Sequence, residues 1–192
     1  MIESAALTFP AVETGTRFLV QWLDDQNKVL GRSEVMDYPT NLLQALKPLA
    51  GGRPVGLLDP ERQLGPLLKS LGLELEDLAD VGMERFSGRL AFVGPFPSPG
   101  QVPGNLVERV AAFAKSGVAM VWIQAPSGKE PALEPAAYPV RVGSGTVVIV
   151  QSKSVANPTQ SPLAQLNLVR MAELALNPDQ LSLPFFKPQS HD

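Results

Sequence analysis

The stretch GVAMVWIQ, residues 117–124, decides how the chain is expected to fold. It is apolar at every position before Gln124, so it lacks the alternation of a strand with one face in water. Such a strand is expected where helices cover both faces of a sheet, as in parallel α/β domains. Gln124 then marks the carboxyl edge of the sheet, where ligands bind in folds of this kind.

Strand and helix patterns alternate on both sides of this stretch, from residue 40 onward. The other expected strands are PVGLLD, GRLAFVG and the hairpin YPVRVGSGTVVIVQ, with its turn at residues 143–145. The expected helices are NLLQALKPLAGG, DPERQLGPLLKSLG, NLVERVAAFAKSG and SPLAQLNLVRMAELALNP, the last with Ser161 as N-cap. The alternation predicts an α/β fold of three layers, a mostly parallel sheet with helices on both faces.

Residues 1–39 follow a different pattern, a period of two in SAALTFP, TRFLVQWL and VLGRSEVMDY. We expect antiparallel β-strands there, with DDQNK as a hairpin loop. They resemble the last strands of an immunoglobulin-like sandwich, which needs about seven strands to stand alone. We therefore expect an appendage or a remnant of a β-sandwich at 1–39, an α/β domain at 40–180 and a tail at 181–192.

Composition argues against several classes of partner. The chain of 192 residues has a net charge of −3 and no run of Lys or Arg that could follow a phosphate backbone, so no nucleic acid is expected. No apolar run approaches the roughly 20 residues that span a bilayer, and the first residues do not resemble a signal peptide. The compartment stays open, and a periplasmic or extracellular place is compatible with a fragment of a longer protein. Trp22, on a strand edge, favours a protein partner or homo-oligomer through the N-terminal strands.

Two stretches resemble class I glutamine amidotransferase-like domains, which have a flavodoxin-like α/β fold. GVAMVWIQAPSG, residues 117–128, resembles the glycine, buried strand and sharp elbow that carry the nucleophilic cysteine of that family. VRVGSGTVVIVQSKS, residues 140–154, resembles its glycine-turned hairpin, which usually ends in Gln, an aromatic residue, His, Pro and Glu. The order of elements agrees over about residues 40–176. The resemblance implies this family's fold for the α/β part of the chain.

The same stretches depart from the family where its chemistry resides. The elbow offers Gln124 and Ala125 without a thiol, and Lys153 stands where the histidine belongs. Amide hydrolysis by this route needs a thiolate with an imidazole beside it. The chain has no cysteine, and its one histidine is His191, next to the end. The resemblance therefore implies a non-catalytic module for assembly or ligand binding, without a cofactor, within a larger bacterial protein.

The candidate pocket lies at the carboxyl ends of the expected parallel strands. Its polar residues are Asp59, Gln124, Ser127, Gln151, Ser152 and Lys153, with no catalytic residue and no metal ligand assigned. The alternative is a hydrolase acting on a carbohydrate or a small polar substrate at these strand ends. It would use carboxylates, or the serines with Lys153, and a Ser–Lys pair requires a desolvated lysine.

Three further patterns have a structural explanation that we prefer. Asp24, Asp25, Asp59 and Lys153 are residue types of a phosphoacceptor receiver domain. The first two fall in a hairpin loop, however, and Asp59 stands where a helix N-cap is expected. The glycine turn at 143–145 leads into a strand, which favours a hairpin over a phosphate loop. LELEDLAD, residues 73–80, has the oxygen ligands that calcium takes, but we favour a solvated acidic loop.

Overall fold

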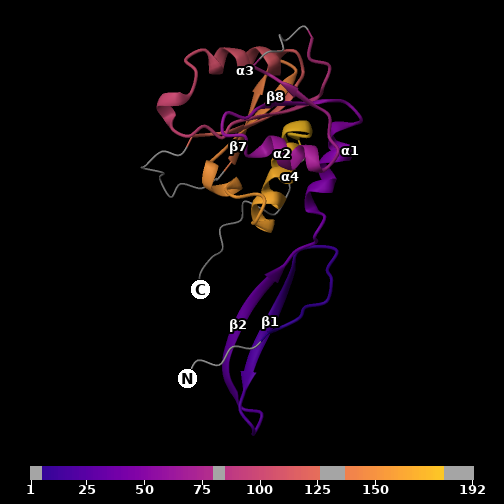
Figure 1. The fold of residues 1–192 in the computed structure, drawn as a ribbon, viewed down its shortest axis with the longest axis vertical. Coiled ribbons are helices and arrows are strands. Elements are labelled where there is room, and N and C mark those ends of the chain that lie inside the picture. The colour runs from indigo at the N-terminus through magenta and orange to yellow at the C-terminus, as the bar shows by residue number, and fades with distance from the viewer. Residues whose placement is uncertain (1–5, 80–84, 126–136, 180–192) are drawn as a thin grey trace. The chain divides into compact units, whose positions relative to one another are not determined.

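The computed structural model describes residues 6–79, 85–125 and 137–179. The chain forms two compact units, Met1–Leu42 and Leu43–Asp192. The first contains a two-stranded antiparallel sheet, and the second contains a six-stranded sheet with helices (Figure 1). This agrees with the prediction of an α/β fold preceded by antiparallel strands.

The first unit is a β-hairpin. Its strands β1 (Thr16–Leu23) and β2 (Val29–Asp37) pair antiparallel, with a bulge near the loop that joins them. Asp24 organises this loop, because its carboxylate accepts hydrogen bonds from the backbone N–H groups of Gln26 and Lys28 at 2.9 and 2.8 Å. The hairpin loop predicted from DDQNK is therefore confirmed, and Asp24 has a structural role in it.

The strand expected over SAALTFP is wrong for its described part, residues 6–10, which has no regular secondary structure. Pro10 cannot donate a ladder hydrogen bond, which weakens pairing there. The segment is tied down by a side chain instead, since the ring of Phe9 lies 5.0 Å from that of Phe18 on β1, centroid to centroid.

The second unit is built on a sheet with the strand order β4-β3-β5-β6-β8-β7. Its strands are β3 (Val55–Leu58), β4 (Leu75–Asp77), β5 (Leu90–Val93), β6 (Ala119–Ile123), β7 (Ala137–Val142) and β8 (Gly145–Val150). All neighbours pair parallel except β7, which is antiparallel to β8 at the edge. Pro139 lies in this edge strand, the position in a sheet where proline is tolerated.

Helices cover both faces of the sheet. The helical segments are η1 (Leu42–Ala45), α1 (Leu46–Ala50), α2 (Leu64–Ser70), η2 (Pro99–Gln101), α3 (Leu106–Lys115), η3 (Ser152–Val155) and α4 (Pro162–Leu176). One buried cluster joins α1, α2 and α4 to Val148 of β8. A second cluster joins α3 to Val147, the residue before Val148 on the same strand. Because successive strand residues face opposite sides, these are the two faces of one sheet. In the described part of the chain, no helix has the length and apolar character to cross a bilayer.

Two local predictions are corrected. LELEDLAD is not a loop throughout, because its residues Leu75–Asp77 form β4 and pair parallel with β3. The acidic side chains make a strand difficult to predict from the sequence. The apolar residues of the segment nevertheless pack in the core, Leu75 against one buried cluster and Leu78 within the other. The hairpin turn consists of Gly143 and Ser144 alone, since Gly145 begins β8.

Candidate functional site

The carboxyl ends of the parallel strands meet at one edge of the sheet, as predicted. At this edge, backbone hydrogen bonds continue between neighbouring chain segments after the strands end, both for β3 with β5 and for β6 with β8. The N–H of Gly94 donates to the carbonyl of Leu58 at 2.8 Å, and the N–H of Gln124 donates to that of Val150 at 2.9 Å. The segments after β3 and β5, and those after β6 and β8, are therefore held together in pairs.

Gly94 brings the segment after β5 close to the end of β6. It has a φ of +89°, and a Cβ at this position would lie 2.4 Å from the carbonyl oxygen of Ile123. Only glycine accepts both the backbone conformation and the approach. The chain continues through a cis peptide bond to Pro95 and then buries Phe96, which is 1% exposed. This loop fills space on the α3 face of the sheet with an aromatic core residue that the sequence analysis did not single out.

Asp59 does not offer a free carboxylate at this edge. One of its oxygens accepts a hydrogen bond from the backbone N–H of Gln63 at 3.1 Å. The other accepts from the N–H groups of Leu64 and Gly65, at 2.8 and 2.7 Å. The free N–H groups at the start of a helix need such acceptors. The N-cap residue of α2 is Gln63, so Asp59 does not occupy the predicted N-cap position, but its carboxylate accepts the hydrogen bonds of the N–H groups at the start of this helix.

The segment after β8 holds three of the predicted site residues. Gln151 and Ser152 are half-buried and Lys153 is exposed, at the start of the short helix η3. Asn167 of α4 holds this helix by donating a hydrogen bond to the carbonyl of Ser154 at 2.7 Å. Asn167 is a positioning residue that the sequence analysis missed, because nothing in its helical pattern distinguishes it from a surface amide.

The pairing of β6 with β8 brings Gln124 and Gln151 together at this edge. Both follow directly after the last residues of those strands, Ile123 and Val150, which are opposite one another. Gln124 is exposed and Gln151 half-buried. Ser127 lies outside the described residues. The predicted site residues described after β6 and β8 thus carry two amides, a hydroxyl and an exposed ammonium group, which are groups that hydrogen-bond to polar ligands.

A pocket of about 530 Å³ lies beside Asp59, between β3, β4 and α2. Its charged lining residues are Asp59, Arg62, Lys69 and Asp77. The carboxylate of Asp77 accepts a hydrogen bond from the backbone N–H of Ala79 at 2.8 Å. Both acidic groups of this pocket accept backbone hydrogen bonds, three at Asp59 and one at Asp77.

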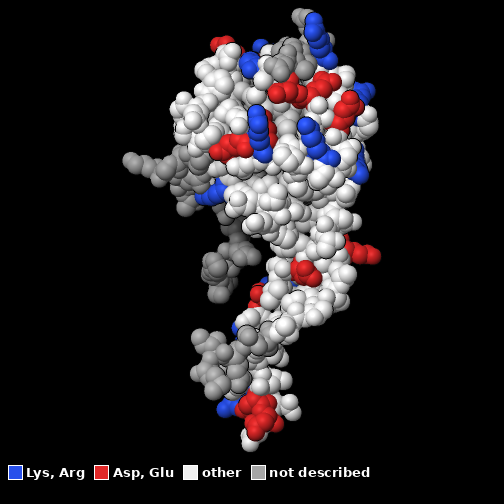
Figure 2. Space-filling view, in the orientation of Figure 1, with Lys and Arg blue, Asp and Glu red and all other residues white. Residues whose placement is uncertain are grey.

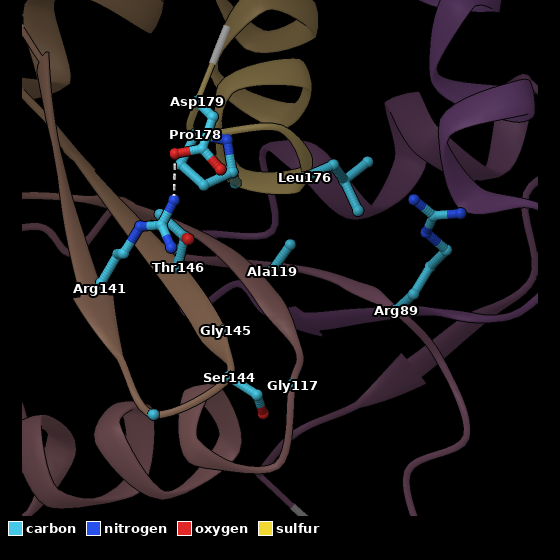
Figure 3. A pocket seen from close by; sticks show the side chains of 12 residues that line it. Arg89, Gly117, Ala119, Arg141, Ser144, Gly145, Thr146, Leu176, Pro178 and Asp179 are labelled. Carbon is cyan, nitrogen blue, oxygen red and sulfur yellow. Dashed lines mark hydrogen bonds and ion pairs between the residues drawn. The ribbon is translucent and has the colours of Figure 1, made fainter. Parts of the chain in front are cut away.

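A second pocket, of about 440 Å³, lies at the opposite edge of the sheet, where β6 and β8 begin (Figure 3). Arg141 lies on one side of it and forms an ion pair with Asp179, while Arg89 lies on the other side. The partners in this ion pair are largely exposed, with side-chain accessibilities of 61% and 88%. Pairs of this kind contribute little to stability. The amino edge of a parallel sheet is also not where ligands of such folds bind.

The acidic residues of 73–80 do not converge. Glu76 and Asp77 are successive residues of β4, so their side chains leave opposite faces of the sheet. Within the three described stretches of the chain, no three His, Cys, Asp or Glu side chains are grouped so that they could hold a metal ion. The acidic segment thus supplies one residue to the pocket beside Asp59 and one to the opposite face.

Comparison of the sequence with protein-family models, with curated proteins and with solved structures finds no match in any of the three.

Proposed function

We propose that the α/β unit is a non-catalytic amidotransferase-like module that serves assembly or ligand binding within a larger protein. The observation that carries the proposal is the hydrogen bonding of Asp59, the acidic residue after β3. Its two carboxylate oxygens accept three backbone hydrogen bonds. A carboxylate in this position organises a helix and has little capacity left for proton transfer. The strand order supports the resemblance, because β4-β3-β5-β6-β8 follows the flavodoxin-like order and β7 adds an antiparallel edge.

Two features support ligand binding in place of chemistry at the carboxyl edge. Of the residues that the sequence singles out there, those described after β6 and β8 are Gln124, Gln151, Ser152 and the exposed Lys153, and the first three offer amides and a hydroxyl. These groups recognise neutral polar ligands by hydrogen bonding and do not provide a nucleophile with its base. Their backbone is held by the β6 and β8 ladder and by Asn167, so the edge is preorganised for binding.

The hydrolase alternative has less support. Lys153 is exposed at the start of η3, which does not provide the desolvation that a Ser–Lys pair requires. Asp59 and Asp77, the two carboxylates that line the pocket between β3, β4 and α2, accept hydrogen bonds from backbone N–H groups.

The proposal is tested by assaying the full chain for hydrolysis of L-glutamine, of chromogenic glycosides and of chromogenic esters. We expect no turnover above buffer, and no difference between the wild type and the Ser152→Ala and Lys153→Ala variants. Lys47→Ala, an exposed lysine on α1 that lines neither pocket, is the matched control. Turnover that falls in the Ser152 and Lys153 variants but not in the Lys47 control would overturn the proposal in favour of the hydrolase.

A further inference from the structure

The hairpin of the first unit exposes apolar side chains and unpaired strand edges. Within the described residues, β1 and β2 pair only with each other, so each strand has one open edge. A hairpin of two strands is marginally stable in water without further packing. Leu30 is nevertheless 68% exposed, Leu19 56% and Trp22 46%. The face of the hairpin in view is mostly uncharged, with a group of acidic side chains at the tip and a few other charged side chains along it (Figure 2). An additional strand is therefore expected to complete this sheet.

The open edge of β2 carries opposite charges around its middle. Its sequence is VLGRSEVMD, in which Arg32 and Glu34 flank Ser33. A closed dimer interface uses the same surface twice, so a residue on one side of a two-fold axis meets its counterpart from the other side. A two-fold axis at Ser33 would place Arg32 of each copy directly opposite Glu34 of the other.

We propose that β2 pairs antiparallel with β2 of a second copy of this chain, about a two-fold axis at Ser33. The hairpins then form a four-stranded antiparallel sheet in the order β1-β2-β2-β1. The bulge near the hairpin loop involves Leu30, so the regular ladder between the copies covers residues 31–35. Two Arg32–Glu34 pairs and two pairs of Gly31 with Val35 lie within it.

The neighbouring registers are disfavoured by charge. A strand register can change only in steps that keep each side chain on its own face of the sheet. Moving the axis by one residue to Arg32 would place the two Arg32 side chains directly opposite each other. Moving it to Glu34 would do the same with the two Glu34 carboxylates, and like charges directly opposite are destabilising. The axis at Ser33 is the one among these three that pairs opposite charges.

Local contacts strengthen the choice of this edge. The carboxylate of Glu34 lies 3.2 Å from the guanidinium of Arg17 on β1, with side chains 60% and 66% exposed, so the pair lies on a solvent-exposed face of the hairpin. In the dimer this carboxylate would lie between Arg17 of its own chain and Arg32 of the second copy. The other edge lacks this complementarity, because Arg17 is the only charged residue of β1. Leu30 and Met36, 68% and 47% exposed, flank the paired segment and meet across the axis.

The dimer rests on the first unit alone and does not depend on the proposed function of the α/β unit. A catalytic activity found in the second unit would leave it intact. Conversely, a monomeric protein could still be a non-catalytic ligand-binding module. The two claims therefore fail in different experiments.

The test is a charge exchange across the axis, followed by sedimentation velocity on the full chain. Arg32→Glu places Glu opposite Glu34, and Glu34→Arg places Arg opposite Arg32, in each case twice per dimer. We expect either variant to dimerise about tenfold or more weakly than the wild type, since each of two cross-strand pairs changes from attractive to repulsive. An equimolar mixture of the two variants should dimerise again, as should the double variant R32E/E34R, because both restore opposite charges. Asp25→Asn, which removes an exposed charge in the hairpin loop outside the β2 ladder, should dimerise within a few-fold of the wild type.

A second variant locates the axis. The chain has no cysteine, so Ser33→Cys introduces a single thiol. Directly opposite residues of an antiparallel pair have Cα atoms about 4.5–5.5 Å apart, within the range a disulfide spans. Mild oxidation should convert this variant to a covalent dimer, whereas Gln21→Cys on β1 should remain mostly unlinked.

Restored dimerisation in the mixture together with cross-linking through position 33 supports the proposal. A wild type that stays monomeric over about a hundredfold range of concentration would overturn it, whether the hairpin is then covered by its own chain or by another protein. Dimerisation that is unaffected by both charge reversals, or a mixture that stays monomeric, would also overturn it. If the mixture of the two single variants dimerises, misfolding of these variants is excluded as the cause of their weaker self-association.

Discussion

Replacing Asp59 by alanine is expected to destabilise the α/β unit while leaving its overall fold unchanged. The substitution removes acceptors for the backbone N–H groups of Gln63, Leu64 and Gly65, two of them partly buried. Loss of a helix cap costs roughly 0.5–2 kcal/mol. Because one side chain here serves three donors, we expect a loss near the upper end, about 2 kcal/mol. For a unit of this size, this corresponds to a fall in Tm of about 6 °C.

The measurement is urea-induced unfolding, followed by the fluorescence of Trp122 in a Trp22→Phe background so that the hairpin does not contribute. Asp77→Asn is the matched control, because Asp77 lines the same pocket and its carboxylate accepts one exposed backbone hydrogen bond, from Ala79. The control should lose no more than about 0.5 kcal/mol. If Asp59→Ala is as stable as the control, the carboxylate is not committed to α2, and the reasoning that removes it from catalysis is refuted.

Three other substitutions test the positions that shape the site. Ser161→Ala removes the hydroxyl that accepts the N–H of Ala164 at the start of α4 and should cost about 1 kcal/mol in thermal or urea unfolding. Gly94→Ala should cost at least about 2 kcal/mol, because of its φ of +89° and the approach to β6, whereas Gly100→Ala, with open space around it, should change stability by less than about 0.5 kcal/mol. Asn167→Ala removes the hydrogen bond to η3, so hydrogen exchange of residues 151–155 should accelerate while the β8 amides stay protected.

The α/β architecture could be predicted because its signals are strong and local. The apolar run before Gln124 is typical of a strand covered on both faces, and β6 lies between β5 and β8. Ser161 and the proline after it mark the start of α4, where the hydroxyl caps the helix. Each of these signals is contained in a short stretch of the sequence, so it can be recognised without knowledge of distant residues.

The errors occur where distant residues decide the structure. β4 has three residues, two of them acidic, and becomes a strand because β3 offers an edge to pair with. The segment containing Phe9 has the alternation of a strand, but it packs by a ring contact with Phe18 without pairing. The same limit applies to the site. The sequence places Asp59 and Gln124 at one edge of the sheet, but the three hydrogen bonds that engage Asp59 and the support from Asn167 depend on the folded geometry.

The most direct test of the central claim, that the α/β unit does not catalyse amide hydrolysis, uses L-glutamine labelled with 15N in its side-chain amide. The full chain is incubated with it at high protein concentration, and the amide signal is followed by NMR over many hours. We predict that the signal decays no faster than in buffer alone, and that it remains so after Gln124→Ala. Loss of the amide signal with matching formation of labelled ammonium, abolished by Gln124→Ala or Gln151→Ala, would contradict the account.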